Sequence, residues 1–194
     1  METAEIRGEH KTEARLIIAC QQGDRAAFRQ LYETYKDRVY SFAVYALHGD
    51  RATAEDVTQE VFVRLFSAIG QFRHEANFST WLYRLVANAC TDELRKRKRL
   101  IPLQALGEEG GVSSEPDPYA RLEISQAVQA ALAELSPELR IPVLLKYFDE
   151  LSYEEMATVL ECPKGTIASR LNRGLKFLAQ RLAPTCGRTA PERK

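Results

Sequence analysis

Apolar residues recur at intervals of three and four along most of the chain, and alternating runs of the kind that form strands are absent. The pattern predicts an all-α protein. In the first half it predicts a helix over 14–22 and a long helix that begins after Asp24 and reaches about Leu47. A third helix follows the potential cap Thr53, and a fourth contains Trp81 and runs into a basic stretch.

These helices predict a first domain over residues 14–100. The apolar stripe of its third helix is expected to be Val57, Val61, Leu65, Phe66 and Ile69. Over 101–118 the periodicity fails and Gly, Pro and acidic residues accumulate, which predicts a flexible acidic linker. A second small helical domain is predicted over 119–182, followed by a disordered tail over 183–194.

The second domain contains the pattern of a helix-turn-helix. Ser152 and Glu155 have the spacing of a capping box and begin a helix of about two turns. A short break follows, and a longer helix begins at Lys164 with a regular apolar side. Many such turns carry glycine where this chain has Glu161, and a left-handed backbone there costs a residue with a side chain about 1–2 kcal/mol.

The second of these helices presents a polar, cationic face. At 100° per residue, the side opposite the apolar one carries Ser169, Asn172, Arg173 and Lys176. Such side chains can reach base edges in a major groove, and the flanking Lys164 and Arg170 suit phosphates. The Thr166 hydroxyl and the N–H groups near it offer an anion site. The alternative is an amphipathic surface helix whose charges are only solvated, but the short capped helix and the break before it favour DNA binding.

Charge is balanced overall but segregated along the chain. Lys and Arg together number 27, as do Asp and Glu, which excludes a uniformly basic nucleic-acid coat. One unbroken cationic run consists of Arg95, Lys96, Arg97, Lys98 and Arg99. Cations at the end of a helix complement its dipole, which is one interpretation. The mutual repulsion of five adjacent cations favours contact with phosphates.

The sequence contains no arrangement typical of an enzyme or a metal site. The four cysteines are scattered, and the three histidines stand apart from one another. No nucleophile–base pair and no glycine-rich phosphate loop is recognisable. We therefore expect no catalytic residues, no metal and no cofactor. The chain shows no signal peptide and no apolar run long enough for a membrane helix, which predicts a cytoplasmic protein without direct membrane insertion.

Three segments resemble a known family. The segments 54–64 and 79–84 resemble conserved region two of bacterial sigma factors, and Gly165 to Leu171 resembles their region four. The resemblance covers about residues 14–182, in the family's order. Because no large region-one or region-three domain is evident, the chain is similar to the extracytoplasmic-function branch, the minimal sigma factors that direct RNA polymerase to stress or envelope-response genes.

The resemblance implies a role for each surface. One flank of the third helix would dock on the clamp coiled-coil of the polymerase largest subunit, through Asp56, Gln59, Glu60 and Arg64. The first domain would capture a flipped base and melt the minus-ten element, through Phe72, Asn77, Phe78, Asn88 and the basic run. Trp81 could serve melting as well, but its spacing to Leu85 favours a core position. The second domain would read the minus-thirty-five element.

The implied partners are core RNA polymerase, contacted at its clamp helices and flap, double- and single-stranded promoter DNA, and an anti-sigma protein, often a membrane-bound one. Two other functions stay open at this point. A stand-alone regulator would pair the same DNA-reading motif with a helical sensor or dimerisation domain. A non-DNA adaptor of helical hairpins would use the amphipathic faces but leave the segregation of basic residues unexplained.

Overall fold

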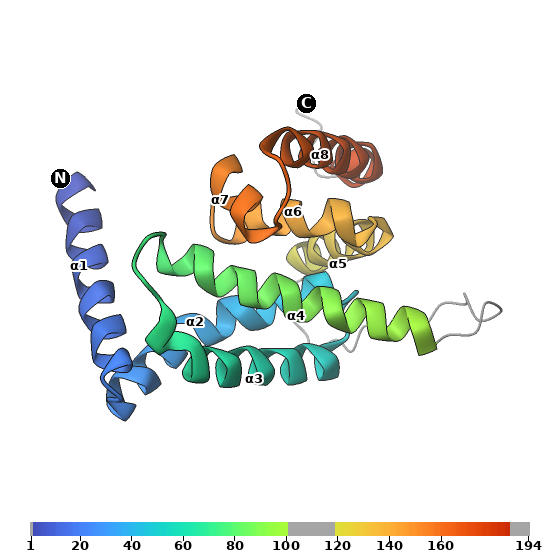
Figure 1. The fold of residues 1–194 in the computed structure, drawn as a ribbon. Coiled ribbons are helices and arrows are strands. Elements are labelled where there is room, and N and C mark those ends of the chain that lie inside the picture. The colour runs from blue at the N-terminus through green and yellow to red at the C-terminus, as the bar shows by residue number, and fades with distance from the viewer. Residues whose placement is uncertain (1, 101–118, 187–194) are drawn as a thin grey trace.

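The computed structural model describes residues 2–100 and 119–186, with side chains for 12–99 and 126–183 (Figure 1). Every regular element in these stretches is helical, which confirms the predicted fold class. The elements are α1 (Glu2–Gln21), α2 (Arg25–Ala46), α3 (Arg51–Ala68), the 3-10 turn η1 (Ile69–Gln71), α4 (Phe78–Leu100), α5 (Tyr119–Glu134), α6 (Pro137–Phe148), α7 (Tyr153–Val159) and α8 (Lys164–Cys186). The predicted linker 101–118 and the segment 187–194 lie outside the described residues.

Aspartates begin the two helices that form the base of the first domain. The Asp24 carboxylate accepts a hydrogen bond from the N–H of Ala26 at 2.8 Å, so the predicted cap of α2 is confirmed. The predicted cap of α3 was wrong. Asp50 occupies that position and accepts from the N–H of Thr53 at 2.9 Å. The helix begins one turn earlier than predicted, and Thr53 supplies a first-turn N–H instead of the cap.

Two further expectations for this domain need correction. Helix α1 begins at Glu2 and not near Ala14, because residues 2–13, most of which are good helix formers, have no apolar stripe by which a pattern could detect them. Phe66 is 58% exposed although it was placed in the apolar stripe of α3. Phe66 lies 100° around the helix from the buried Leu65. Its ring packs edge-on against the ring of Phe28, at 4.9 Å between centroids.

The second domain contains the expected helix-turn-helix. The capping box of Ser152 and Glu155 begins α7, as predicted. Glu161, in the turn, has a φ of 50°, so the left-handed backbone is present without a glycine to relieve it. Gly174 lets α8 cross α6 closely, since an added Cβ would lie 3.0 Å from Val143 Cγ2. Helix α8 continues to Cys186, so the predicted tail begins too early, because composition does not mark the last turn of a helix.

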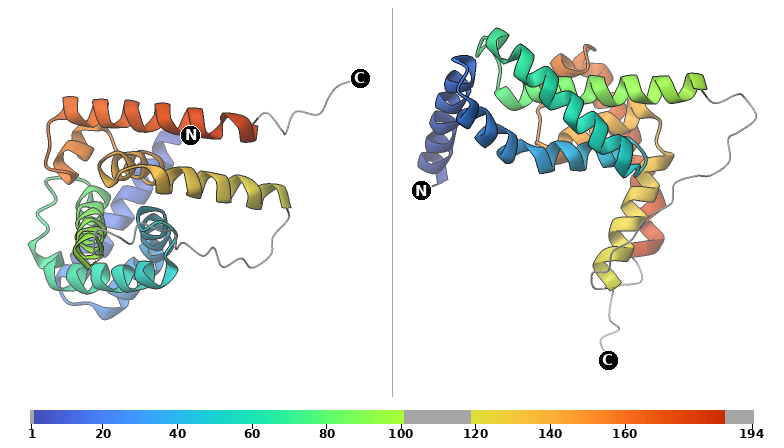
Figure 2. Two further views of the ribbon diagram at one scale, coloured as in Figure 1. Left: turned by 90° about the vertical axis from the view of Figure 1, so that its right-hand side faces the viewer. Right: turned by 90° about the horizontal axis from the view of Figure 1, so that it is seen from below.

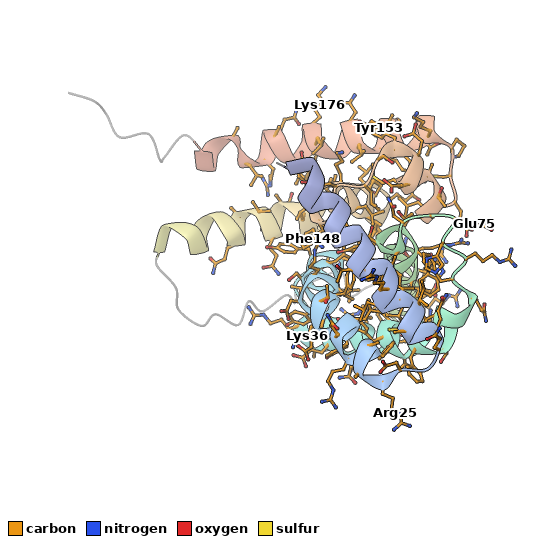
Figure 3. The ribbon with its side chains drawn as sticks, turned by 90° about the vertical axis from the view of Figure 1, so that its left-hand side faces the viewer. Arg25, Lys36, Glu75, Phe148, Tyr153 and Lys176 are labelled. Atoms are coloured by element: carbon orange, nitrogen blue, oxygen red, sulfur yellow. The ribbon has the colours of Figure 1, made fainter. Side chains whose placement is uncertain are left out.

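The two helical domains are packed against each other (Figure 2). Helices α5–α8 gather on one side of α2 and α4. The Phe148 ring lies between the domains, 6.0 Å from the ring of Phe42 and 5.6 Å from that of Tyr45 (Figure 3). Arg140, in α6, is 1% exposed and donates to backbone carbonyls of both domains. Within the described residues, no helix combines the length and apolar character that crossing a membrane requires.

Candidate nucleic-acid and polymerase interface

The outer face of α8 carries the side chains predicted to read base edges. All four, Ser169, Asn172, Arg173 and Lys176, are exposed. The opposite side of the helix is anchored by Ile167 and Leu171, which are at most 2% exposed. Lys176 projects from α8 away from the first domain (Figure 3). The helix therefore offers a free cationic face on a rigid support, which is the geometry that entry into a major groove requires.

The residues predicted to flank this face are less free. The Lys164 ammonium pairs with Glu154, and this hydrogen bond lowers the pKa of the Glu154 carboxyl. Arg170 is half-buried, 3.8 Å from the Glu138 carboxylate and 3.8 Å from the sulfur of Cys162. The N–H of Thr166 donates to the carbonyl oxygen of Pro163 at 2.8 Å, so this N–H is not available to an anion.

A loop and the start of α4 form the predicted minus-ten site. Gln21, from α1, holds this loop: its amide nitrogen donates to the carbonyl oxygens of Ile69 at 3.1 Å and Phe72 at 2.8 Å. The ring of His74 lies near the same amide, at 3.4 Å. Sequence reasoning missed Gln21, because its partners are backbone atoms about fifty residues away and leave no pattern in the sequence.

An open pocket of about 230 Å³ lies beside this loop. It is lined by Gln71, Phe72, Arg73, Glu75, Ala76, Thr80, Trp81, Arg84 and Thr158. The rings of Phe72 and Trp81 form its apolar wall, 5.4 Å apart between centroids. Trp81 is half-buried in this cluster, so it supports the core and also faces the pocket.

Two of the predicted minus-ten residues support this site from beneath. Phe72 is 7% exposed and Phe78 is 3% exposed, and their rings pack edge-on at 5.6 Å between centroids. Phe78 is not among the residues that line the pocket, and a buried ring has no free face for a base, so direct DNA contact by Phe78 is corrected to a role in positioning the loop. Phe72 packs in the same core but also lines the pocket, so its contact with a base stays a prediction.

The two asparagines of the predicted site behave differently. The Asn77 amide donates to the Glu155 carboxylate of the second domain at 2.8 Å. Asn88 is exposed on α4 and lines a second pocket, of about 390 Å³. Arg95 of α4, Pro137 of α6 and further residues of α6 and α7 line the same pocket. Both side chains thus lie on the surface of α4 and its preceding loop that faces the second domain.

The basic run at the end of α4 is partly neutralised. Three of its five cations have acidic partners, which are Asp92 for Arg95 at 3.6 Å, Glu93 for Lys96 at 3.2 Å and Asp50 for Arg97 at 2.5 Å. Mutual repulsion within the run is therefore weaker than the sequence alone suggests, because acids lie one helical turn away and at the N-cap of α3. Lys98 and Arg99 are exposed, and no acid among the described residues pairs with them.

The predicted docking flank of α3 is on the surface. Asp56 and Gln59 are exposed, and Arg64 pairs with Glu60 at 2.5 Å. Two large apolar side chains stand exposed on the same helix, Val63 at 66% and Phe66 at 58%. Sequence reasoning missed Val63 and misplaced Phe66. An exposed apolar pair beside charged residues is a combination that protein interfaces use.

Comparisons with known proteins identify the family. The chain matches two protein families, the one described as "Sigma-70 region 2" over residues 31–100 and the one described as "Sigma-70, region 4" over residues 125–178. It is 35% identical over 178 residues to the ECF RNA polymerase sigma factor SigW of Bacillus subtilis, covering 86% of this chain and 94% of that protein. It is 32% identical over 188 residues to the ECF RNA polymerase sigma-E factor of Escherichia coli K12, covering 91% of this chain and 97% of that protein.

Solved structures agree with this result. The sigma factor RpoE in its complex with the anti-sigma factor NepR from Bartonella quintana has a TM-score of 0.70 and 26% identity, over 80% of this chain and 96% of that chain. CnrH, in complex with the cytosolic domain of CnrY, has a TM-score of 0.66 at 23% identity, over 87% of this chain and 96% of that chain, and supports the fold. The chain therefore belongs to the extracytoplasmic-function sigma factors of the sigma-70 family, which are DNA-binding initiation factors of transcription and not enzymes.

Proposed function

We propose that this sigma factor reads promoters at two sites, the outer face of α8 and the surface of α4, and that the pocket beside Trp81 captures a flipped base of the minus-ten element. The observation that carries the proposal is the pocket itself, which combines an aromatic wall with cationic and polar groups at the start of α4.

The pocket has the chemistry that a flipped base needs. Trp81 supplies an apolar ring surface, and Thr80 supplies a hydroxyl at the same place. The exposed cations Arg73 and Arg84 stand on opposite sides of Trp81 in the sequence and suit the phosphates on either side of an extruded nucleotide. Lys98 and Arg99 would extend phosphate contact along α4. A base leaving the stack would thus exchange one stacked environment for another.

The flank of α3 is the proposed docking surface for core polymerase. The exposed Val63 and Phe66 would form the apolar centre of this interface. Asp56, Gln59 and the Glu60–Arg64 pair would surround it as a polar rim. The clamp helices of the largest subunit are the proposed partner of this flank, and the flap is the proposed partner of the second domain.

The minus-thirty-five element is the proposed ligand of α8. Arg173 would bond guanine and Asn172 would bond adenine, the pairings that their donor and acceptor geometry favours. Lys164 and Arg170 would contact phosphates after exchanging their present partners, Glu154 and Glu138.

Regulation by an anti-sigma protein, often membrane-bound in such systems, is also proposed, with a regulon of stress or envelope-response genes. The support is the similarity to RpoE of Bartonella quintana, whose structure was solved with an anti-sigma factor. The cytoplasm, where polymerase meets the chromosome, is the proposed site of action.

Opening of the minus-ten element by the pocket can be tested with core polymerase and a promoter found by transcription of genomic DNA. Arg73→Ala removes a pocket cation, and Arg25→Ala removes an exposed cation at the start of α2 that does not line the pocket (Figure 3). We expect R73A to slow the appearance of unpaired thymines, measured by permanganate reactivity, while R25A matches the wild type. Equal opening by R73A and the wild type would exclude the pocket from melting.

A further inference from the structure

One helix of the second domain, α7, lies directly over the proposed DNA surface of the first (Figure 1). Near its start, Glu155 accepts hydrogen bonds from the Asn77 amide at 2.8 Å and the Thr80 hydroxyl at 3.1 Å. Just beyond its end, Glu161 pairs with Arg84. Two carboxylates, one at each end of α7, therefore occupy polar and cationic groups on the loop and first turns of α4.

The same helix reaches the pocket proposed for the flipped base. Thr158, near the end of α7, lines the pocket together with Trp81 and Arg84. The second domain also borders the pocket beside Asn88 and Arg95 through α6 and α7. In this arrangement the polar groups that would meet DNA on α4 are therefore covered or already engaged.

The backbone at Glu161 supports a specific role for its side chain. Glu161 adopts a φ of 50°, a conformation that glycine reaches without strain. A strained residue persists where its surroundings fix it, and such outliers gather at functional contacts. The contact that Glu161 makes is the one with Arg84, so its carboxylate has a use at this position that glycine could not supply. His48 is a second left-handed residue, and its ring contacts Arg140 across the same domain boundary at 2.5 Å.

We propose that the free protein adopts a closed, self-inhibited state in which α7 covers the promoter-melting surface of α4, with the Glu155 and Glu161 carboxylates in the place of DNA phosphates and base edges. This inference rests on the proposed function of α4. The rest of the boundary holds the closed state: Phe148 packs on Phe42 and Tyr45, and Arg140 donates to the carbonyl oxygen of Ala46.

The carboxylate contacts suit displacement. The Arg84 and Glu161 side chains are 46% and 67% exposed, and exposed ion pairs contribute little each and weaken with salt. Polyanionic DNA can therefore replace them once polymerase holds the two domains apart. The closed state would keep the free protein from binding single-stranded DNA without preventing its use by polymerase.

The closure is tested with neighbouring residues of α6. Phe148→Asp places a charge in the domain boundary, whereas Tyr147→Asp adds the same charge at a side chain that is 66% exposed. We expect small-angle X-ray scattering to show a larger radius of gyration for free F148D, with wild type and Y147D compact. Circular dichroism checks that both variants remain helical. A wild type that is already extended, or an F148D that is folded and stays compact, would overturn the closed state.

The masking is tested with a fluorescent, A/T-rich single strand of about 12 nucleotides, a length within known site sizes. Because apparent affinity scales with the open fraction, we expect F148D to bind at least about fivefold more tightly than the wild type. An added negative charge alone weakens DNA binding, so this increase has no trivial explanation, and Y147D provides the charge-matched control. An F148D that is extended and binds no more tightly would overturn the masking.

The role of the Glu161 carboxylate in the place of DNA is tested with a matched pair of variants. Glu161→Gln removes the carboxylate that meets Arg84, whereas Glu134→Gln removes one that pairs with Arg181 inside the second domain. We expect E161Q, and not E134Q, to bind the single strand more tightly. Equal effects would overturn the role of Glu161. Transcription by the wild type with core polymerase tests the proposed function separately, because compactness is measured without DNA or polymerase.

Discussion

The guanidinium of Arg140 donates to the carbonyl oxygen of Ala46, at the end of α2, at 2.6 Å, across the boundary between the two domains. It also donates to the carbonyl oxygens of Leu132 at 2.7 Å and Leu135 at 2.6 Å, near the end of α5. One side chain thus donates to carbonyls at the ends of two helices, where the last turn leaves carbonyl oxygens without an N–H four residues further on. Burial lowers the pKa of Arg140 to about 10, which leaves it charged at neutral pH.

Replacing this arginine should cost substantial stability. Arg140→Met fills a similar volume but leaves several buried carbonyls without donors, at about 1–3 kcal/mol for each unsatisfied group. We expect a loss of at least about 3 kcal/mol in the free energy of unfolding, measured by urea denaturation. Arg181→Met removes an exposed arginine paired with Glu134 and should change stability by less than about 1 kcal/mol. Similar losses for the two variants would contradict the role given to Arg140.

Base reading by α8 predicts a selective loss. Arg173→Ala should weaken binding of the polymerase holoenzyme to its minus-thirty-five element by about 1–3 kcal/mol, because a bidentate contact to guanine would be lost. Competition between the matched element and a scrambled one measures the effect. The control is Arg181→Ala, which removes the same residue type from the same helix but from the contact with Glu134. An unchanged preference in R173A counts against base reading by Arg173.

The loop of the minus-ten site depends on Gln21. Gln21→Ala removes two hydrogen bonds to loop carbonyls, each worth about 0.5–1.5 kcal/mol, and should both destabilise the fold and slow promoter opening. Its neighbour Gln22 is exposed, so Gln22→Ala should change stability by no more than about 0.5 kcal/mol. Fluorescence of 2-aminopurine in the minus-ten element follows opening. If Q21A opens the promoter as fast as Q22A, the loop does not need this support.

Docking on polymerase should depend on the exposed apolar pair of α3. Val63→Asp places a charge at the centre of the proposed interface without disturbing the core, since Val63 is 66% exposed. Binding to core polymerase should weaken by about 2 kcal/mol or more, in the range of interface hot spots, with unfolding unchanged. Gln30→Asp, at an exposed position of α2, is the control. Full affinity of V63D would place the docking surface elsewhere.

His48 should make the closed state sensitive to pH. Desolvation at the domain boundary, and then the nearby Arg140 and Arg97, lower the pKa of His48 from 6.5 to about 4. The open state would bind the proton more readily, so the closed state should lose stability as pH falls from 6.5 toward 4. Asp149 acts in the opposite direction, because burial raises its pKa.

The radius of gyration at about pH 7.5 and about pH 5.5 measures this effect. His48→Asn removes the titration, and asparagine tolerates the left-handed backbone at this position. The wild type should expand more than H48N on acidification. Equal expansion of the two proteins would exclude His48 as the group responsible.

The helices of the second domain were predictable because their signals are local. The capping box of Ser152 and Glu155, the break at Glu161 and the apolar side of α8 each involve residues within one or two helical turns. The exposed face of α8 followed from 3.6-residue periodicity alone. The start of α1 was not predictable, because helix propensity without an apolar stripe leaves no boundary.

The contacts between the two domains could not be predicted from the sequence, for a different reason. Arg140, Phe148 and Glu155 meet partners about eighty to one hundred residues away, and several of these partners are backbone carbonyls that every residue possesses. Periodicity likewise could not separate Phe78, which is buried and does not line the pocket, from Phe72 and Trp81, which do. An aromatic cluster can form a core or a binding wall, and only packing decides between them.

The proposed direction of core RNA polymerase to promoters can be measured by adding the purified protein to sigma-free core polymerase on genomic DNA and sequencing the transcript starts. We expect discrete starts that share two upstream elements and disappear without the protein. Starts scattered as they are with core polymerase alone would show that the chain does not direct polymerase to promoters.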